Sequence, residues 1–172
     1  GRTGATLIEP NAAAAQPDIV CLGKALGCGY VASAVLARTK LAERAWERGG
    51  VEPAHTSTSI GDPVACAGIL RSLVRIEHRG EQIEDSSLAW RECLEQLAAD
   101  TRLELRGTGL LWALDTGAVG GGVELARRLL DEERMLVIPS GLEGSAITLY
   151  PAVICTDLER DRFSRSIHSV LV

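Results

Sequence analysis

The feature that most constrains the fold is a short apolar run between turn residues near the start of the chain. Asp18-Ile19-Val20-Cys21-Leu22-Gly23 has no polar side chain between its first and last residues, which is typical of a strand buried on both faces. A second run of this kind, residues 33–37, follows a glycine-rich turn. Strands covered on both faces need helices as neighbours, so the sequence predicts an α/β fold.

Helical patterns occupy much of the remaining chain. Asp62 and Pro63 form a helix start, because the carboxylate caps free N–H groups and proline lacks only an N–H that would be unpaired there. We expect helices over 39–48, from Pro63 to about Gly80, over 82–99 and 123–134, and from the capping-box sequence Thr156-Asp157-Leu158-Glu159 onward. Short strands are expected near 103–105, 109–114, 135–138 and 146–149. The change in texture predicts a domain boundary between residues 76 and 100.

Composition excludes several classes of protein. The chain has 172 residues, 46% of them hydrophobic, and a net charge of −5, which indicates a globular protein without a basic surface for nucleic acid. No stretch free of charged residues exceeds 13 residues, too short to span a bilayer. No signal peptide is visible in the sequence, and the five cysteines favour reduced core thiols over disulfides or a metal site. We therefore expect a cytoplasmic protein without a metal.

Lys24 is the first candidate for chemistry. It lies where the first strand ends, between Leu22-Gly23 and Ala25-Leu26, so its ammonium is expected to be poorly solvated. Poor solvation favours the neutral amine that Schiff-base chemistry needs. Local sequence leaves one alternative open, a lysine that reaches solvent at the corner between a strand and a turn.

Three further patterns each have a functional and a structural interpretation. Gly27-x-Gly29-x-x-Ala32 matches a loose dinucleotide fingerprint, but it also suits a tight turn before another strand. The run His55-Thr56-Ser57-Thr58-Ser59 places hydroxyls ahead of a helix N-terminus, where phosphate binds, although such clusters also serve as helix caps. Arg106-Gly107-Thr108-Gly109 suits an anion clamp or the turn that ends a strand.

In order along the chain, these motifs resemble the second half of a class III aminotransferase, a pyridoxal-phosphate enzyme of fold type I. The resemblance rests on Gly1-Arg2-Thr3-Gly4, on Pro17-Asp18-Ile19-Val20 with Leu22-Gly23-Lys24-Ala25-Leu26-Gly27, and on His55-Thr56-Ser57-Thr58 with Gly61-Asp62-Pro63. Arg106-Gly107-x-Gly109-Leu110 and the region of Pro151 extend it over essentially the whole chain. It implies that residues 1–76 complete a large cofactor-binding domain and that residues 77–172 form a small C-terminal domain with its connecting helix.

The resemblance also assigns roles to three residues. Lys24 corresponds to the lysine that forms a Schiff base with pyridoxal 5'-phosphate and then moves a proton between substrate and cofactor. Thr58 corresponds to the threonine that binds the cofactor phosphate, with Ser57 beside it. In this family that threonine reaches in from the neighbouring subunit, so a homodimer is expected. The implied reaction transfers an amino group between an amine or amino acid and a keto acid, without nucleic acid or membrane as partner.

Two departures from the family qualify this expectation. The family's aspartate that pairs with the pyridinium nitrogen would fall before Gly1, so we expect the 172 residues alone to be inactive. Thr148 stands where many members have an arginine that grips an α-carboxylate, which favours an amine or ω-amino substrate. The alternative interpretation is a degenerate or truncated non-catalytic module that pairs with another subunit.

Overall fold

A computed structural model of the chain describes residues 1–3, 17–46 and 57–171. The chain divides into two compact units. One consists of Thr6–His78, and the other combines Gly1–Ala5 with Arg79–Val172. The chain therefore leaves the second unit after its first residues and returns to it at Arg79. No helix in the described ranges is long and apolar enough to cross a membrane.

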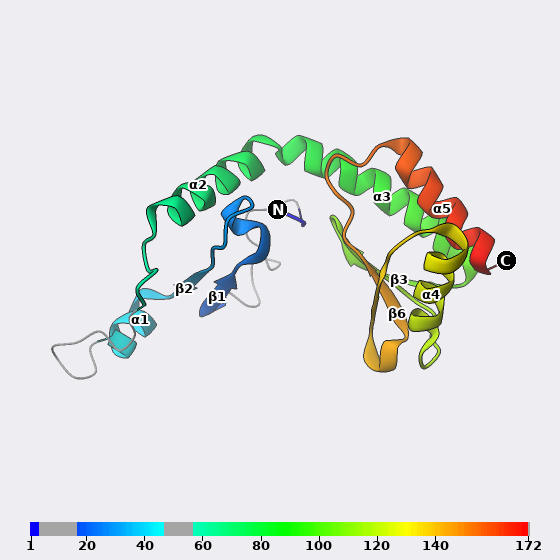
Figure 1. Cartoon of the computed structure of the whole chain (residues 1–172), viewed down its shortest axis with the longest axis horizontal. Helices are drawn as coiled ribbons and strands as arrows, with labels where there is room; N and C mark the ends of the chain where they lie inside the picture. Colours follow the sequence, from blue (N-terminus) through cyan, green and yellow to red (C-terminus); the bar gives the residue numbers. More distant parts are fainter. Residues whose placement is uncertain (4–16, 47–56, 172) are drawn as a thin grey trace. The chain divides into compact units, whose positions relative to one another are not determined.

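The described residues of the unit Thr6–His78 form a two-stranded antiparallel hairpin, a 3-10 turn and two helices (Figure 1). Ile19 lies opposite Ala37 in the hairpin, and Leu22 lies opposite Ala34. The elements are β1 (Ile19–Leu22), η1 (Lys24–Gly27), β2 (Ala34–Ala37), α1 (Thr39–Trp46) and α2 (Pro63–His78). Both strands and both helices confirm elements that the apolar pattern predicts, whereas the turn after β1 is more regular than expected.

The burial expected of these strands is wrong for the described chain. Ile19 is 53% exposed and Val35 is 69% exposed, because a two-stranded hairpin has too few neighbours to cover either face. The expectation that the cysteines lie in the core is also wrong for the described chain. Three of the five cysteines are exposed and two are half-buried, and all are free: Cys21, Cys28 and Cys66 in this unit, Cys93 and Cys155 in the other.

Helix α2 begins as the sequence predicts. The backbone N–H of Ala65 donates to Oδ1 of Asp62 at 2.7 Å, and Pro63 occupies the first helical position. The helix ends at His78, and α3 (Gly80–Thr101) begins after the single residue Arg79. The short gap that the sequence predicts between these two helices is confirmed, although it lies at Arg79 rather than near residue 81.

The second unit contains a four-stranded antiparallel sheet with the order β3-β4-β6-β5. Figure 1 shows α3, α4 and α5 together beside this sheet. Its strands are β3 (Glu104–Thr108), β4 (Leu111–Asp115), β5 (Ile138–Ser140) and β6 (Ala146–Leu149), and its other elements are α4 (Gly121–Glu133), η2 (Leu142–Gly144) and α5 (Asp157–Leu171). Strand β6 lies where the sequence predicts it, and β5 is shifted from the expected 135–138.

The core of the second unit lies between the sheet and its helices. Leu114 of β4 faces Ile147 of β6, and both are fully buried. Each of the three helices contributes a fully buried side chain to this core: Leu94 from α3, Leu129 from α4 and Ile167 from α5. Burying each such side chain stabilises the unit by about 1.5–3 kcal/mol relative to exposure. This unit therefore has a hydrophobic core of its own.

The last helix starts at the predicted capping box. The Glu159 carboxylate accepts a hydrogen bond from the Thr156 backbone N–H at 2.7 Å and another from the Thr156 hydroxyl at 2.9 Å. The Glu159 N–H donates back to the Thr156 hydroxyl at 3.3 Å. Thr156 and Glu159 thus satisfy each other's backbone groups, as the sequence predicts.

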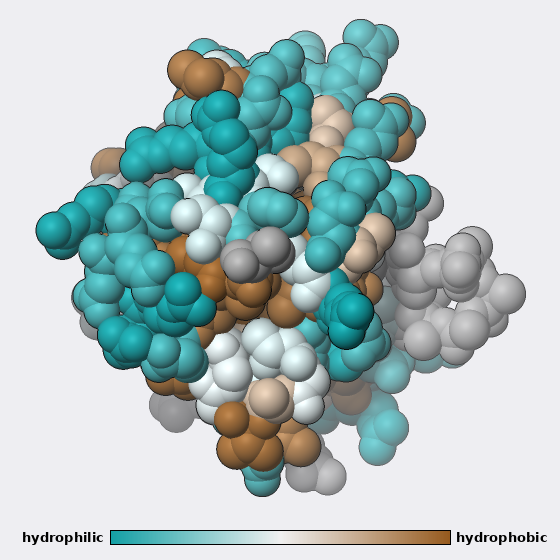
Figure 2. Space-filling view, turned by 90° about the vertical axis from the view of Figure 1, so that its right-hand side faces the viewer, coloured by the Kyte–Doolittle hydropathy of each residue, from teal (hydrophilic) through white to brown (hydrophobic). Residues whose placement is uncertain are grey.

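Some apolar surface stays uncovered in the described chain. Figure 2 shows apolar side chains gathered in the middle of one face, with hydrophilic residues to both sides and residues of intermediate hydropathy below them. Large exposed apolar residues of the second unit include Leu136, Leu142, Ile154 and Leu158. Apolar surface of this extent is typical of a protein that meets another polypeptide.

Candidate active site

Lys24 is the first residue of η1 and lies directly after the turn that ends β1. Its backbone has φ +53°, a left-handed conformation that L-residues other than glycine, asparagine and aspartate rarely adopt. Its side chain is exposed, so the apolar neighbours in the sequence do not desolvate it, and the expectation of a poorly solvated ammonium is wrong for the described chain. Among the described residues, Lys24 has no hydrogen-bond or ion-pair partner.

The turn that carries Lys24 is held firmly against helix α2. The Ser72 hydroxyl donates to the carbonyl of Ala25 at 3.3 Å, and Ser72 is itself only 8% exposed. Gly68 lets the helix approach so closely that a Cβ there would lie 2.5 Å from the Gly27 carbonyl oxygen. These contacts with α2 give the turn that carries Lys24 a defined position.

Sequence reasoning did not single out the two helix residues that support this turn. Gly68 lies inside a helical pattern, where glycine lowers stability unless close packing requires it. That local cost was the signal that would have identified Gly68. Nothing in the local sequence indicates the role of Ser72, because serine is common in helices and does not by itself predict a close contact.

The hydroxyl cluster lies ahead of α2 and is only partly described, since His55 and Thr56 fall outside the described residues. Ser57 accepts a weak hydrogen bond from the Ser59 N–H at 3.4 Å. Thr58 is exposed and its hydroxyl makes no hydrogen bond to another described residue. The first turn of α2 is already capped by Asp62, and the Thr58 and Ser59 hydroxyls have no hydrogen-bond partner among the residues that the structure describes.

The structure does not bring the predicted cofactor residues into direct contact. Lys24 and Thr58 lie in the same unit, and no hydrogen bond joins them among the described residues. The η1 turn packs against the middle of α2, whereas Thr58 precedes the start of that helix. The turn that carries Lys24 is therefore beside the middle of α2, and Thr58 lies before the start of that helix.

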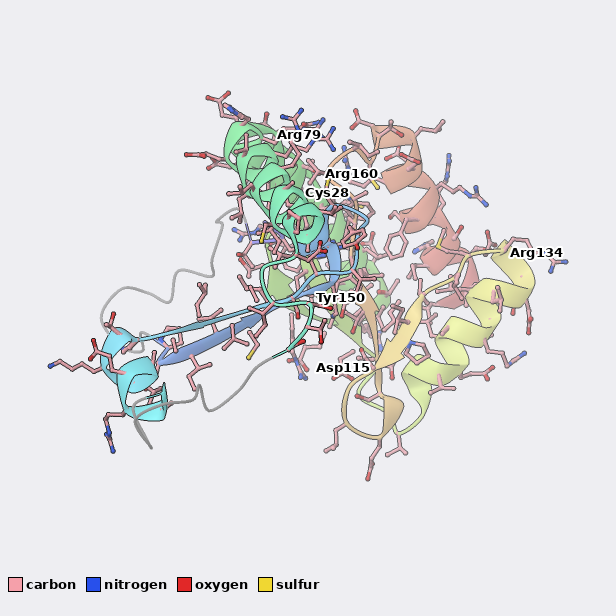
Figure 3. All side chains as sticks on the ribbon, turned by 60° about the vertical axis from the view of Figure 1, so that its left-hand side comes forward. Cys28, Arg79, Asp115, Arg134, Tyr150 and Arg160 are labelled. Atoms are coloured by element: carbon pink, nitrogen blue, oxygen red, sulfur yellow. The ribbon has the colours of Figure 1, made fainter. Side chains whose placement is uncertain are left out.

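The glycine-rich turn after Lys24 does not bind a dinucleotide in the way the loose fingerprint requires. Cys28, labelled in Figure 3, caps η1 in a left-handed conformation, and Gly29 has φ +99°. The chain then enters strand β2 instead of a helix. Without a helix N-terminus there is no phosphate site of that type, so the tight-turn interpretation is confirmed.

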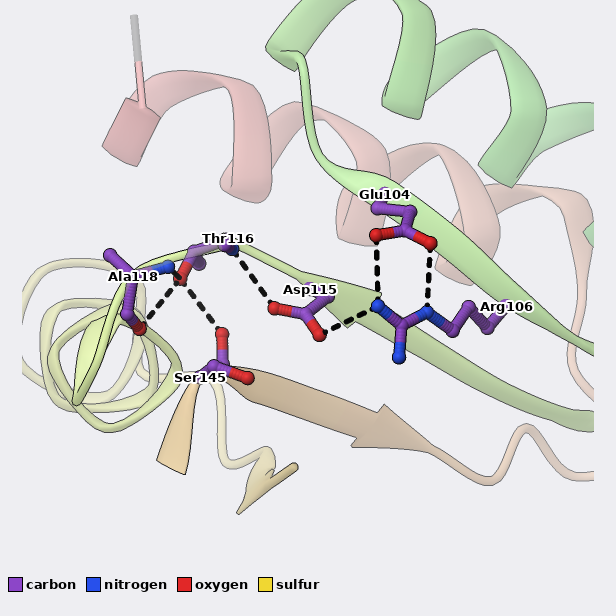
Figure 4. Close-up of polar contacts among 7 residues, drawn as sticks. Glu104, Arg106, Asp115, Thr116, Ala118 and Ser145 are labelled. Atoms are coloured by element: carbon purple, nitrogen blue, oxygen red, sulfur yellow. Dashed lines mark hydrogen bonds and ion pairs between the residues drawn. The ribbon is translucent and has the colours of Figure 1, made fainter. Parts of the chain in front are cut away.

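Arg106 is engaged by carboxylates within its own sheet (Figure 4). Its guanidinium lies 2.8 Å from Glu104 and 3.2 Å from Asp115. The hydrogen bond from Arg106 lowers the pKa of the Glu104 carboxyl, and the Gly117 N–H lowers the pKa of Asp115. Both carboxylates are therefore charged at neutral pH, and Arg106 is not a free anion clamp.

Thr148 lies in the same cross-strand row of the sheet as Arg106. The row runs from Arg106 through Ala113 and Thr148 to Ile138. The Thr148 and Ser140 hydroxyls hydrogen-bond each other. Because Arg106 is occupied by two carboxylates, this row offers hydroxyls and apolar groups, and no free cation, among the residues that the structure describes.

A pocket of about 580 Å³ borders this end of the sheet. Trp90, Tyr150 and Phe163 contribute aromatic walls, and Thr148 and Ile138 line it as well. Its described lining contains no lysine, arginine or histidine, and its one acidic residue, Glu159, is already bound by Thr156. The pocket therefore suits an apolar or amine-bearing group better than a carboxylate.

Comparison with known proteins gives a consistent picture. A family model described as Aminotransferase class-III matches residues 1–171. A diaminobutyrate--2-oxoglutarate aminotransferase from Rhizobium meliloti is 31% identical over 182 residues, which is 95% of this chain and 37% of that protein. The chain thus spans well under half the length of the curated relatives that it matches.

Solved structures agree with the sequence comparison. An acetylornithine aminotransferase from Elizabethkingia anophelis superposes with a TM-score of 0.72 at 28% identity, over 99% of this chain and 44% of that chain. A PLP-bound aminotransferase mutant from Vibrio fluvialis gives a TM-score of 0.78 at 25% identity, over 99% of this chain and 40% of that chain. The mixed α/β fold expected from the sequence is confirmed as part of this fold.

Proposed function

Because this chain belongs to the class III aminotransferase family, we propose that it forms the part of a pyridoxal-phosphate-dependent transaminase that supplies the reactive lysine. The whole protein transfers an amino group between an amine or amino acid and a keto acid. The observation that carries the proposal is Lys24, exposed on a left-handed turn that Gly68 and Ser72 hold against α2. A cytoplasmic homodimer is part of the same proposal.

The described residues fit pyridoxal 5'-phosphate in their chemistry. An aldehyde needs an accessible amine and a phosphate needs hydroxyl or N–H donors, which Lys24 and Thr58 offer with their exposed side chains. When bound, the cofactor supplies an electron sink for negative charge at the substrate carbon. In this proposal Nζ of Lys24 holds the cofactor covalently and, as a free amine, carries the proton that moves during transfer.

Thr58 and Ser57 are proposed to bind the phosphate. The first turn of α2 already has a carboxylate cap at Asp62, so the phosphate relies on the hydroxyls rather than on that helix end. In the proposed dimer these hydroxyls belong to the site of the neighbouring subunit, which agrees with the lack of a direct contact between Thr58 and Lys24.

Thr148 bears on the class of substrate. The row of the sheet that contains Thr148 has no free cation among the described residues, because Glu104 and Asp115 hold Arg106. A carboxylate bound there would lack the bidentate partner that such groups favour. We propose that the amino donor is an amine or an ω-amino compound rather than an α-amino acid held through its carboxylate.

The reactive lysine can be tested directly in the full-length protein. Borohydride reduction in the presence of pyridoxal phosphate should attach the cofactor to Lys24, as read by peptide mass spectrometry. Lys40, exposed on α1, is the other lysine of this chain and serves as the internal control. Label on Lys40, or on neither lysine, would contradict the proposal.

A non-catalytic module that pairs with another subunit is the competing proposal. It predicts that Lys24→Ala leaves every activity of the native assembly unchanged, whereas the transaminase proposal predicts loss of amino transfer with Lys40→Ala unaffected. The 172-residue chain alone is expected to show no transfer activity, because it spans well under half of its relatives. Addition of the separately produced remainder should restore it.

A further inference from the structure

The first residues of the chain are fastened to the sheet of the second unit. The Leu110 N–H donates to the carbonyl of Arg2 at 2.6 Å. The Arg2 side chain then reaches two other carbonyls through Nη1, that of Pro151 at 3.1 Å and that of Leu110 at 3.4 Å. Its guanidinium lies 5.1 Å from the centre of the Tyr150 ring, a distance that favours a cation–π interaction.

The turn that receives Arg2 is shaped for this contact. Gly109 has φ +60°, and a Cβ there would lie 2.3 Å from the Arg2 carbonyl oxygen and 2.7 Å from Cα of Thr3. From the other side, Nε1 of Trp112 donates to the Gly109 carbonyl at 2.7 Å. Only glycine accommodates both the positive φ and the close approach of the backbone of residues 2 and 3. Gly109 is therefore required for this contact.

Arginine is the side chain that this junction requires. A guanidinium is planar, so it donates hydrogen bonds in its plane while its face lies over an aromatic ring. Arg2 does both, with carbonyls of Leu110 and Pro151 and with the Tyr150 ring. Tyr150 is shown in Figure 3 and directly follows β6, the strand of Thr148. A lysine could keep one of these contacts but not the set.

Arg2 lies at the start of the stretch of chain that contains Lys24. Residues 1–5 and residues from Arg79 onward belong to one unit, and Lys24 lies in the stretch between them. That stretch is therefore held at both ends on the same unit. Holding both ends of a segment lowers the number of conformations it can adopt.

We propose that Arg2 is a positioning residue. By fastening residues 1–3 to the Gly109–Leu110 turn and to Tyr150–Pro151, it fixes the start of the segment that leads to Lys24 on the unit that carries Thr148. Its effect on turnover rests on the function proposed above. The contact itself is tested by measurements that need no turnover.

The test uses the full-length protein loaded with cofactor and four variants. Arg2→Ala and Gly109→Ala remove the junction from its two sides, Arg2→Lys keeps the charge, and Arg128→Ala removes a half-buried arginine of α4 that pairs with Glu132. Three quantities are measured: the exchange rate of the Leu110 amide, kcat and KM for the amino donor, and borohydride labelling of Lys24.

Arg2→Ala is expected to raise Leu110 exchange about tenfold or more, because the acceptor of that N–H becomes mobile. It is also expected to lower kcat/KM about tenfold or more, mainly through KM, since small misplacements of substrate contacts are costly. Lys24 labelling should stay at the wild-type level. Arg2→Lys should recover part of both losses, Gly109→Ala should resemble Arg2→Ala, and Arg128→Ala should change nothing.

Two results would overturn the positioning role. One is unchanged Leu110 exchange in Arg2→Ala, and the other is faster exchange with kcat and KM both unchanged. A wild-type protein in which Lys24 is not labelled is a different failure. It would remove the proposed function, while the exchange of Leu110 would still decide whether Arg2 holds the junction.

Discussion

The two units of this chain differ sharply in how they bury their apolar side chains. In the unit with Arg79–Val172, five residues from helices and strands have no exposed surface: Leu94, Leu114, Leu129, Ile147 and Ile167. In residues 17–46 and 57–78, only Gly27 and Ser72 are buried. The unit that carries Lys24 is therefore the one that lacks a core among its described residues.

The two units are therefore stabilised in different ways. The second unit is stabilised by its own side chains, as expected of a unit with a filled core. Around Lys24 the order is local and comes from one packed contact, the η1 turn against α2. Strands β1 and β2 consist almost entirely of apolar residues, which is typical of strands covered on both faces. We therefore expect further polypeptide to cover them in the whole protein.

The largest effect is expected from a cavity in the filled core. Leu114→Ala should lower the free energy of unfolding by about 2–5 kcal/mol, because Leu114 is fully buried opposite Ile147. Val35→Ala, at a residue 69% exposed, should change it by less than about 0.5 kcal/mol. Urea unfolding of the chain, followed by tryptophan fluorescence, measures the free energy of unfolding of both variants. Similar losses in the two variants would contradict the difference between the units.

An intermediate effect is expected at the one packed contact beside Lys24. Gly68→Ala would place a Cβ 2.5 Å from the Gly27 carbonyl oxygen, so it should destabilise the local structure by about 1–3 kcal/mol. This reverses the usual result, since alanine normally stabilises a helix relative to glycine. Hydrogen exchange of the α2 amides in the full-length protein measures the change.

Gly80→Ala is the matched control for that experiment. Gly80 opens α3 and has no atom near the position of an added Cβ, so alanine there should leave exchange in α3 unchanged or slower. If Gly68→Ala also protects its helix, the close approach of η1 and α2 is wrong.

The smallest effect is expected at the helix cap of the second unit. Hydrogen bonds from Thr156 lower the pKa of the Glu159 carboxyl below its ordinary value. A carboxyl whose pKa is lowered on folding adds stability above its unfolded pKa, and that stability is lost as the pH falls through the folded pKa. The stability difference between wild type and Glu159→Gln should therefore be present at neutral pH and disappear in acid.

Thr156→Val offers a second route to the same cap, because it removes the hydroxyl and keeps the backbone N–H. It should reduce the pH-dependent difference without abolishing it. Thermal unfolding midpoints between pH 2 and pH 7 measure both variants, and a Glu159→Gln difference that grows in acid would contradict the assignment.

The local signals in the sequence predicted the elements well where the cause is local. The Asp62-Pro63 start of α2 and the Thr156 capping box are made by neighbouring residues, and both are confirmed. The fifth strand was misplaced because Leu136 and Val137 are as apolar as any strand, while the pairing is set by Thr148 opposite Ile138. Pro139 fits there because β5 is an edge strand.

The sequence predicts a kind of chemistry for the candidate site but not its geometry. The motif around Lys24 favours Schiff-base chemistry, which stays a prediction. The support of its turn by Gly68 and Ser72 depends on a helix some forty residues further on. In the sequence, Arg2 stands out only as part of the Gly1-Arg2-Thr3-Gly4 motif. Its partners Leu110 and Pro151 lie more than a hundred residues away in the sequence, where no local pattern indicates contact.

The division of the second unit between two parts of the chain limits how genes of this family can exchange segments. A crossover near Arg79 transfers the sheet and its helices but leaves residues 1–5 with the other parent. The hybrid then pairs one parent's Arg2 with the other parent's Gly109 turn and Tyr150. A hybrid should therefore fold when both parents have this arginine and this glycine. When they do not, it should fold only if the first residues are exchanged together with the C-terminal segment.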